Sequence, residues 1–189
     1  PGLASKDFEV LQVVSQVLYN GKAGLIDLDL NQQQKVLNSY GYPMGLADYS
    51  AFILGGLPKQ GQTLEEVKDL LLNEIKKLRA GEFDEKMLQA NINNFKLYEL
   101  QSMESNEGRA DIFVNSFING TNWKDEVTAI DRMAKLTKED IVAFADKYLK
   151  EDNYAVVYKK QGKDPNEKKM TKPEITPIVS NRDVASPFL

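Results

Sequence analysis

Residues 47–81 read ADYSAFILGGLPKQGQTLEEVKDLLLNEIKKLRAG, and two different periodicities meet in this stretch. The side chains of residues 47–54 alternate between two faces, which is the period-two pattern of a β-strand. We expect Gly55-Gly56 and Pro58 to end that strand. A helical pattern begins a few residues later, so the stretch predicts a strand followed directly by a helix.

The helix in this stretch begins with a capping box. Thr63 stands at the cap and Glu66 three residues later, so each side chain can accept a free backbone amide of the other residue. Gly81 is expected to end the helix. The apolar residues at helical spacing are predicted to face a core: Leu64, Val67, Leu70, Leu71, Ile75 and Leu78. The polar residues between them are expected to face solvent: Lys68, Asp69, Glu74 and Lys76.

Upstream of this stretch, the sequence predicts a helix, a short amphipathic turn and another strand. The helix starts after the cap residue Ser5 and ends at Asn20-Gly21. Residues 25–30 form the amphipathic turn, and residues 36–42 are expected to be extended. A turn around residues 43–45 would then join two neighbouring antiparallel strands.

Downstream, three helices and a strand are predicted. Asp84 begins the first helix, and Gly108 is expected to bend it. Two more helices follow: Asn122 caps one over residues 123–136, and the capping-box segment Thr137-Lys138-Glu139-Asp140 begins the next, which runs to Leu149. Residues 154–158 are mostly apolar, which predicts the last strand.

Residues 161–189 differ in composition from the rest of the chain. They hold four of the seven prolines, several lysines and few large apolar residues. Proline and the residue before it favour extended backbone. The sequence therefore predicts a folded domain over residues 1–160 and an extended linker or tail over residues 161–189.

The sequence contains no histidine and no cysteine among its 189 residues. The usual zinc sites, Ser-His and Cys-His nucleophile pairs and disulfide frameworks all need one of these residue types. Any activity of this chain would therefore have to rest on carboxylates, lysines, tyrosines, hydroxyls or a bound partner.

Net charge and hydropathy argue against two further classes of protein. A net charge of −4 and a pI near 5.1 argue against a dedicated nucleic-acid binder, which needs a clustered basic surface. No apolar run reaches the roughly 20 residues that span a bilayer. Other proteins and peptides remain as expected partners.

Three polar groups are candidate sites, and each also has a structural interpretation. Asp27 and Asp29 could hold a hard cation, but no calcium-type loop surrounds them, so a polar helix face is the favoured reading. Glu65-Glu66 could act as an acid and a base, but the first helical turn favours capping. Asn119-Gly120-Thr121 is a formal glycosylation sequon, and Asn-Gly is also a turn signal, which we favour.

Two further stretches have basic or glycine-rich composition. Residues 21–24, Gly-Lys-Ala-Gly, are only superficially similar to a phosphate loop, because they follow a helix and lack the Gly-Lys-Ser/Thr ending. The lysines near the carboxyl end are interleaved with acidic residues, which favours a solvated linker over a nucleic-acid contact. These lysines are Lys159, Lys160, Lys163, Lys168, Lys169 and Lys172.

The order of these segments resembles one family over about residues 5–160. The chain is similar to the domain that follows the catalytic domain in pitrilysin/insulinase-type zinc peptidases, the inverzincins. The resemblance is a pattern of elements without a catalytic signature. It is carried by Leu18-Tyr19-Asn20-Gly21, Gly24-Leu25, Asp29-Leu30-Asn31-Gln32, Tyr40-Gly41-Tyr42, Thr63–Leu78, Phe83-Asp84-Glu85-Lys86-Met87-Leu88, Thr137-Lys138-Glu139-Asp140-Ile141, Phe144-Ala145, Tyr148-Leu149 and Tyr154–Tyr158.

The resemblance implies an α+β, two-layer domain in which helices cover one side of an antiparallel sheet. It also implies sister domains that together enclose a peptide substrate in a chamber. The family's catalytic domain holds zinc through H-x-x-E-H and a downstream glutamate. No residue of that motif can be placed here, so no catalytic, metal-binding or cofactor-binding residue is expected in this chain. Zinc is expected only in another domain of the parent protein. Because the chain starts after the position of the family's first strand, we expect a sheet that is one strand short.

We therefore expect a catalytically inactive domain of a bacterial two-half zinc metalloprotease, whose compartment stays open. A scaffolding subunit of a zinc-less homologue is one alternative. A stand-alone α/β interaction module is another.

Overall fold

A computed structural model describes residues 1–163, 168 and 170–177 of the chain. The chain divides into two compact units, Pro1–Val156 and Val157–Leu189. All helices and strands found in the described residues belong to the first unit. In chain order they are α1 (Lys6–Leu18), the π-helix η1 (Asp27–Asn31), β1 (Asn38–Gly45), β2 (Ser50–Leu57), α2 (Leu64–Arg79), α3 (Lys86–Met103), α4 (Asn106–Asn119), α5 (Trp123–Glu126), α6 (Ala129–Met133) and α7 (Lys138–Tyr148).

β1 and β2 form an antiparallel hairpin in which Asn38 pairs with Leu57 and Gly45 with Ser50. The turn lies at residues 46–49, where the Leu46 amide donates to the Tyr49 carbonyl over 3.1 Å. The predicted turn at residues 43–45 is therefore wrong. Pro43 lies inside β1, which is tolerated because β1 is an edge strand of a two-stranded sheet.

β2 also runs through the two glycines that were expected to end it. A Cβ atom at Gly56 would lie 2.4 Å from the Val67 side chain of α2. A Cβ atom at Gly55 would lie 2.3 Å from the Tyr40 ring on the opposite strand. These glycines therefore mark close approaches of other groups to a continuous strand.

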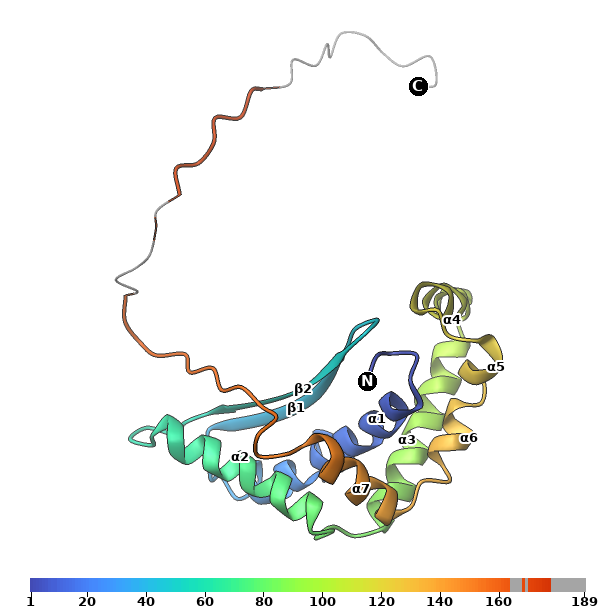
Figure 1. The fold of residues 1–189 in the computed structure, drawn as a ribbon, viewed down its shortest axis with the longest axis horizontal. Coiled ribbons are helices and arrows are strands. Elements are labelled where there is room, and N and C mark those ends of the chain that lie inside the picture. The colour runs from blue at the N-terminus through green and yellow to red at the C-terminus, as the bar shows by residue number, and fades with distance from the viewer. Residues whose placement is uncertain (164–167, 169, 178–189) are drawn as a thin grey trace. The chain divides into compact units, whose positions relative to one another are not determined.

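Helices cover one face of the hairpin, as the resemblance predicted (Figure 1). α1 packs against β1, and α2 packs against β2, while α7 packs against both helices. The capping box of α2 is confirmed, because Thr63 and Glu66 each accept the other's backbone amide. The core between hairpin and helices includes Phe8, Val14, Val17, Leu18, Ile26, Val67, Leu71, Leu78, Ile141 and Phe144.

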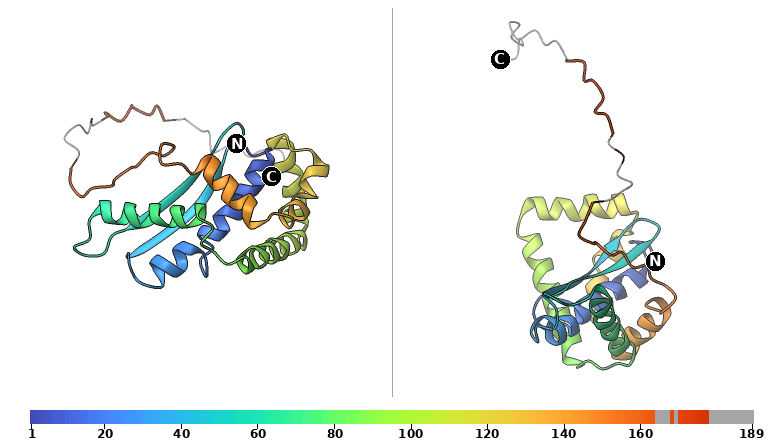
Figure 2. Two further views of the ribbon diagram at one scale, coloured as in Figure 1. Left: turned by 60° about the horizontal axis from the view of Figure 1, so that its bottom comes forward. Right: turned by 90° about the vertical axis from the view of Figure 1, so that its left-hand side faces the viewer.

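The predicted long helix with a bend at Gly108 is instead two helices. α3 ends at Met103, and Ser105 caps α4 by accepting the Gly108 amide over 2.9 Å. Figure 2 shows that the chain turns sharply from α3 into α4. The break lies three residues before Gly108 because a serine cap gives the new helix its own start.

The predicted helix over residues 123–136 is also divided, into α5 and α6. Thr128 stands between them with non-helical backbone angles. Its hydroxyl donates to the Lys124 carbonyl over 2.7 Å. A threonine that bonds local backbone competes with regular helix, which explains the interruption.

Residues 154–158 form no strand in the part of the chain that the structure describes, so that prediction is wrong. An apolar run forms a strand only where a neighbouring strand provides backbone hydrogen bonds to it. Within the described residues, β1 and β2 pair only with each other. None of the described helices is long and apolar enough to cross a bilayer.

Candidate functional site

The outer face of the hairpin, opposite the helices, carries exposed apolar side chains. Tyr40 and Tyr42 stack with ring centroids 6.2 Å apart. Tyr42 is 48% exposed, although it stands in the middle of a strand. Met44 and Leu57 are also exposed on this face. We call the side chains of Tyr40, Tyr42, Met44, Ile53 and Leu57 the outer hairpin face.

A second apolar surface lies on α4 and the start of α5. Phe113 stacks on Trp123 with centroids 4.3 Å apart, and Phe117 is 88% exposed. α4 packs mainly against α3 and α5, and Ser116 is its one buried residue. The exposed apolar side chains of α4 are Phe113, Val114, Phe117 and Ile118. Contiguous apolar surface of this kind is typical of contact sites.

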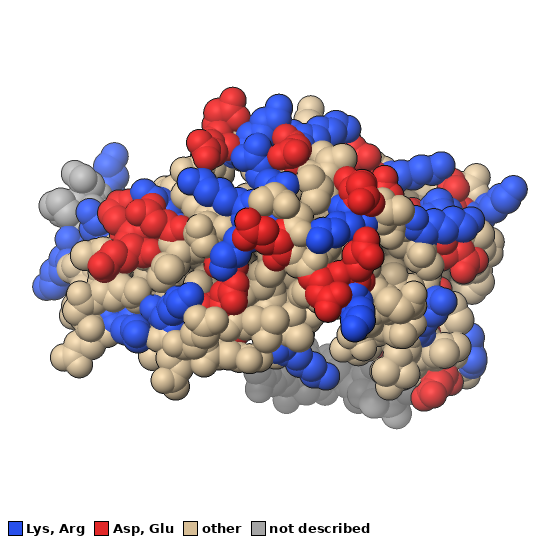
Figure 3. Space-filling model, turned by 90° about the horizontal axis from the view of Figure 1, so that it is seen from below, with Lys and Arg blue, Asp and Glu red and all other residues tan. Residues whose placement is uncertain are grey.

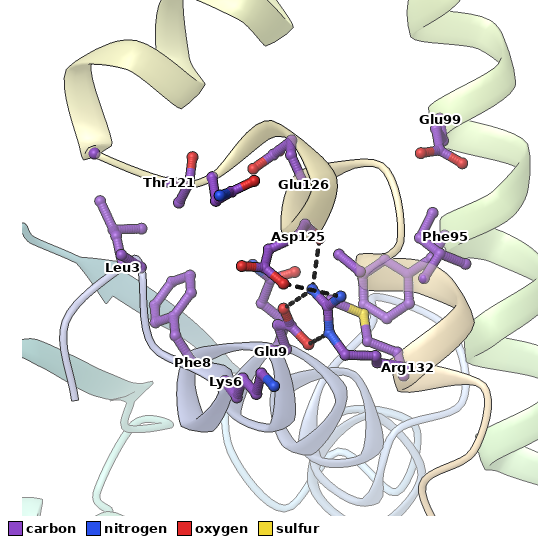
Figure 4. A pocket seen from close by; sticks show the side chains of 17 residues that line it. Leu3, Lys6, Phe8, Glu9, Phe95, Glu99, Thr121, Asp125, Glu126 and Arg132 are labelled. Atoms are coloured by element: carbon purple, nitrogen blue, oxygen red, sulfur yellow. Dashed lines mark hydrogen bonds and ion pairs between the residues drawn. The ribbon is translucent and has the colours of Figure 1, made fainter.

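A hollow of about 430 Å³ lies between α1, α3 and the α4–α6 region (Figure 4). Glu9 of α1 and Arg132 of α6 form a two-pronged ion pair, with Nε to Oε2 at 3.0 Å and Nη2 to Oε1 at 2.5 Å. The other residues that line the hollow are Leu3, Ala4, Lys6, Phe8, Gln12, Phe95, Glu99, Gly120, Thr121, Asn122, Asp125, Glu126, Ala129, Ile130 and Met133.

The guanidinium of Arg132 uses four of its five N–H groups within this hollow. Besides Glu9, it donates from Nη1 to the Thr128 hydroxyl and from Nη2 to the Asp125 carbonyl, each at 2.5 Å. The Glu9 hydrogen bonds, with the nearby acidic charges, raise the pKa of Arg132 above its usual value. The pair links α1 to α6 across 123 residues of sequence. No local pattern could therefore have predicted this hollow.

A buried charge cluster joins η1 to α2. Lys77 Nζ lies 2.6 Å from Asp29 Oδ2 and 2.9 Å from Glu74 Oε1. Glu74 was expected to face solvent, but it is 1% exposed. Burial raises the pKa of Glu74, and Lys77 opposes that shift. At Asp29 burial acts upward, but the hydrogen bond and charge of Lys77 leave the pKa lowered.

Asp27 and Asp29 do not come together as a cation site. Asp27 is 4% exposed, and its Oδ2 accepts the amides of Asn20 and Gly24, both at 3.0 Å. Asp29 is engaged by Lys77. The idea that a polar helix face explains both residues is wrong for Asp27, which is buried as a backbone acceptor. Among the described residues, no group of three or more carboxylates is placed to hold a metal ion.

The other sequence candidates have structural roles. Glu66 caps α2, where hydrogen bonds from Thr63 lower its pKa, and Glu65 pairs with Lys68 at 2.5 Å. The backbone at residues 21–24 is already bonded, since Asn20 accepts the Lys22 and Ala23 amides. A phosphate would therefore find few free donors there.

The sequon lies in a helix-ending turn, as favoured. Gly120 takes a left-handed φ of 64° at the carboxyl end of α4. The Thr121 hydroxyl donates to the Ser116 carbonyl over 3.2 Å. Both observations explain the residues of the sequon as parts of a turn.

Basic residues do not gather on the helical face that Figure 3 shows, where acidic and basic side chains are mixed. The described lysines near the carboxyl end are exposed: Lys159, Lys160, Lys163, Lys168 and Lys172. Lys169 lies outside the described residues.

Comparisons with known proteins identify the fold. The sequence matches no family model, and no curated protein is detectably similar. A protease from Helicobacter pylori is 22% identical with a TM-score of 0.70, over 79% of this chain and 36% of that one. The inactive peptidase domain of a putative zinc protease from Bordetella parapertussis is 18% identical with a TM-score of 0.71, over 81% and 83% of the two chains. A putative zinc protease from Bordetella pertussis Tohama I is 18% identical with a TM-score of 0.69, over 81% and 84%.

At these identities the likeness shows the fold alone. The chain therefore has a peptidase-domain-like α+β fold with an antiparallel sheet covered by helices, as predicted. It spans only 36% of the length of the Helicobacter protein.

Proposed function

We propose that this chain is a catalytically inactive domain of a bacterial zinc metalloprotease of the pitrilysin/insulinase type. The observation that carries the proposal is the match to an inactive peptidase domain over 81% of this chain and 83% of that domain. The absence of histidine and cysteine from the sequence agrees with an inactive role.

The residues of this chain do not fit a zinc site. Zinc in proteins is held mainly by cysteine, histidine and carboxylate ligands, and only carboxylates exist here. The buried carboxylates Asp27 and Glu74 and the partly buried Asp29 already accept amide or ammonium groups. In our proposal, zinc and the catalytic base belong to another domain of the parent protein.

The role of this domain would be to form part of a chamber wall that encloses a peptide. Two exposed apolar surfaces support such a role, the outer hairpin face and the apolar side of α4. Surfaces of this kind suit contacts with sister domains or with an extended peptide. Both would be covered in the assembled protease.

A peptidase assay on the parent protein tests the proposal. We expect cleavage of an unstructured peptide that stops when a zinc chelator is added and returns when zinc is restored. A Tyr42→Glu change on the outer hairpin face should lower cleavage without changing the zinc content. The exposed residue Glu82, on the loop before α3, offers the control Glu82→Gln.

Two results would contradict the proposal. A parent protein that folds but neither binds zinc nor cleaves peptides would favour the scaffolding alternative. Full activity in the Tyr42→Glu variant would remove the outer hairpin face from the contact surface.

A further inference from the structure

The hollow beside α1 holds more carboxylates than it neutralises. Glu9 and Arg132 compensate each other. The remaining charged side chains in its lining are Lys6, Glu99, Asp125 and Glu126. One lysine and three carboxylates give the lining of the hollow a net charge of −2.

Glu99 and Glu126 are the carboxylates that remain available. In the view of Figure 4, Glu99 on α3 and Glu126 on α5 both lie above the Glu9–Arg132 pair. Within the described part of the chain, neither side chain makes a hydrogen bond or an ion pair, whereas Asp125 lies 3.8 Å from Arg132. Both are only partly exposed. An anionic guest would meet these carboxylates and find four of the five Arg132 N–H groups already used.

Apolar side chains complete the lining. Phe8 and Met133 are buried, and Phe95 is half-buried. Phe8 of α1 and Phe95 of α3 line opposite sides of the Glu9–Arg132 pair, as Figure 4 shows, and Met133 of α6 also lines the hollow. A volume of about 430 Å³ lies within the usual range of ligand sites, about 300–1,000 Å³.

We propose that this hollow binds the side chain of an arginine or lysine residue in a peptide. The methylene stem would pack on Phe95 and Met133, and the cationic end would meet Glu99 and Glu126. Arginine should bind more tightly than lysine, because its planar guanidinium can pair with carboxylates through two bonds and stack on an aromatic ring. That the bound side chain belongs to a peptide rests on the proposed function. Recognition of the cationic group does not.

Nuclear magnetic resonance titration of the 189-residue chain tests this site. The probe is acetyl-Ala-Ala-Arg-Ala-Ala-amide, and the comparison peptides carry citrulline or glutamate in place of arginine. Citrulline keeps the shape of arginine but lacks its charge. We expect amide shifts in residues 95–99 and 122–133 with the arginine peptide, and at least about tenfold weaker binding of the citrulline peptide. Salt should weaken the arginine complex.

A double variant, Glu99→Gln with Glu126→Gln, should weaken binding of the arginine peptide at least about tenfold. The control Glu82→Gln with Glu174→Gln changes net charge equally at exposed positions and should bind like the parent sequence. An unchanged amide spectrum away from the hollow would show that the double variant is folded. Rescue of part of the affinity by Glu99→Asp with Glu126→Asp would support a charge-based site.

The inference is overturned by equal binding of the three peptides, by no shifts at millimolar peptide, or by unchanged affinity of the Glu99→Gln, Glu126→Gln variant. None of these results bears on chelator-sensitive cleavage by the parent protein. The two proposals can therefore fail separately.

Discussion

At the scale of single residues, Lys77 compensates the negative charges of two carboxylates. It lies between Asp29 of η1 and Glu74 of α2, and Glu74 has almost no contact with water. A buried carboxylate is tolerated only when a partner compensates its charge. Lys77 therefore stabilises the contact between η1 and α2.

Replacement of Lys77 by methionine should lower the free energy of unfolding by about 2 kcal/mol at pH 7, since it leaves Glu74 buried without a partner. The loss should shrink as the pH falls toward 5. The pKa of Glu74 is raised in the folded state, so the folded chain takes up a proton before the unfolded chain does, and protonation favours folding. Urea unfolding at both pH values measures the difference.

Lys76→Met is the matched control for that experiment. The Lys76 side chain is 63% exposed and lies 3.7 Å from Glu151, so its removal should change stability by less than about 0.5 kcal/mol. An equal loss for Lys77→Met at pH 7 and pH 5 would contradict the assigned role of Glu74.

Sequence patterns predicted single residues best where the contact is local. The capping boxes at Thr63 and Thr137 depend on a spacing of three residues, and both exist in the structure. Glu74 was wrongly expected to face solvent because its position on the helix indicates only the polar face. The local sequence does not show that Asp29, 45 residues away, lies close to it. Glu9 and Arg132 were missed for the same reason.

At the scale of elements, the junction between α3 and α4 depends on Gly108. A Cβ atom at this position would lie 1.9 Å from the Ser102 carbonyl oxygen at the end of α3. Glycine therefore allows the first turn of α4 to approach the last turn of α3. The sequence showed that Gly108 is unusual in a helix but could not show that the chain breaks at Ser105.

Gly108→Ala should lower the free energy of unfolding by about 2 kcal/mol through this clash. Helix propensity alone predicts the opposite sign, a gain of about 1 kcal/mol. Asn115→Ala, at an exposed position of α4, is the control and should be neutral or slightly stabilising. Chemical denaturation followed by circular dichroism distinguishes the two signs, and a more stable Gly108→Ala would contradict the close approach.

The two faces of the hairpin should respond differently to substitution. Tyr42 and Ile53 are paired on the outer hairpin face, whereas Phe52 packs against the core. The double variant Tyr42→Thr with Ile53→Thr should lower the free energy of unfolding by less than about 1 kcal/mol. It should also reduce binding of a dye that reports exposed apolar surface. Phe52→Ala should cost about 2 kcal/mol or more. Similar losses on both faces would show that the outer face is also part of the core.

At the scale of the whole molecule, the resemblance seen in the sequence implied an α+β domain with helices on one side of an antiparallel sheet, and the structure confirms that fold. The strand over residues 154–158 was wrong because a strand requires a partner that local sequence does not specify. The hairpin turn was misplaced because Pro43 was read as a break between strands, and β2 was ended too early because Gly55-Gly56 were read as its end. Their actual roles depend on the edge position of β1 and on the approach of α2 and Tyr40.

The chain has a peptidase-domain-like fold, and the proposed function requires that it lacks the chemistry of a zinc peptidase. Zinc content and peptide cleavage, measured on the purified 189-residue chain after dialysis against zinc, test this requirement most directly. The account predicts that the folded chain retains far less than one equivalent of zinc and cleaves no unstructured peptide. One tightly bound zinc ion per chain, or cleavage that a chelator abolishes, would contradict it.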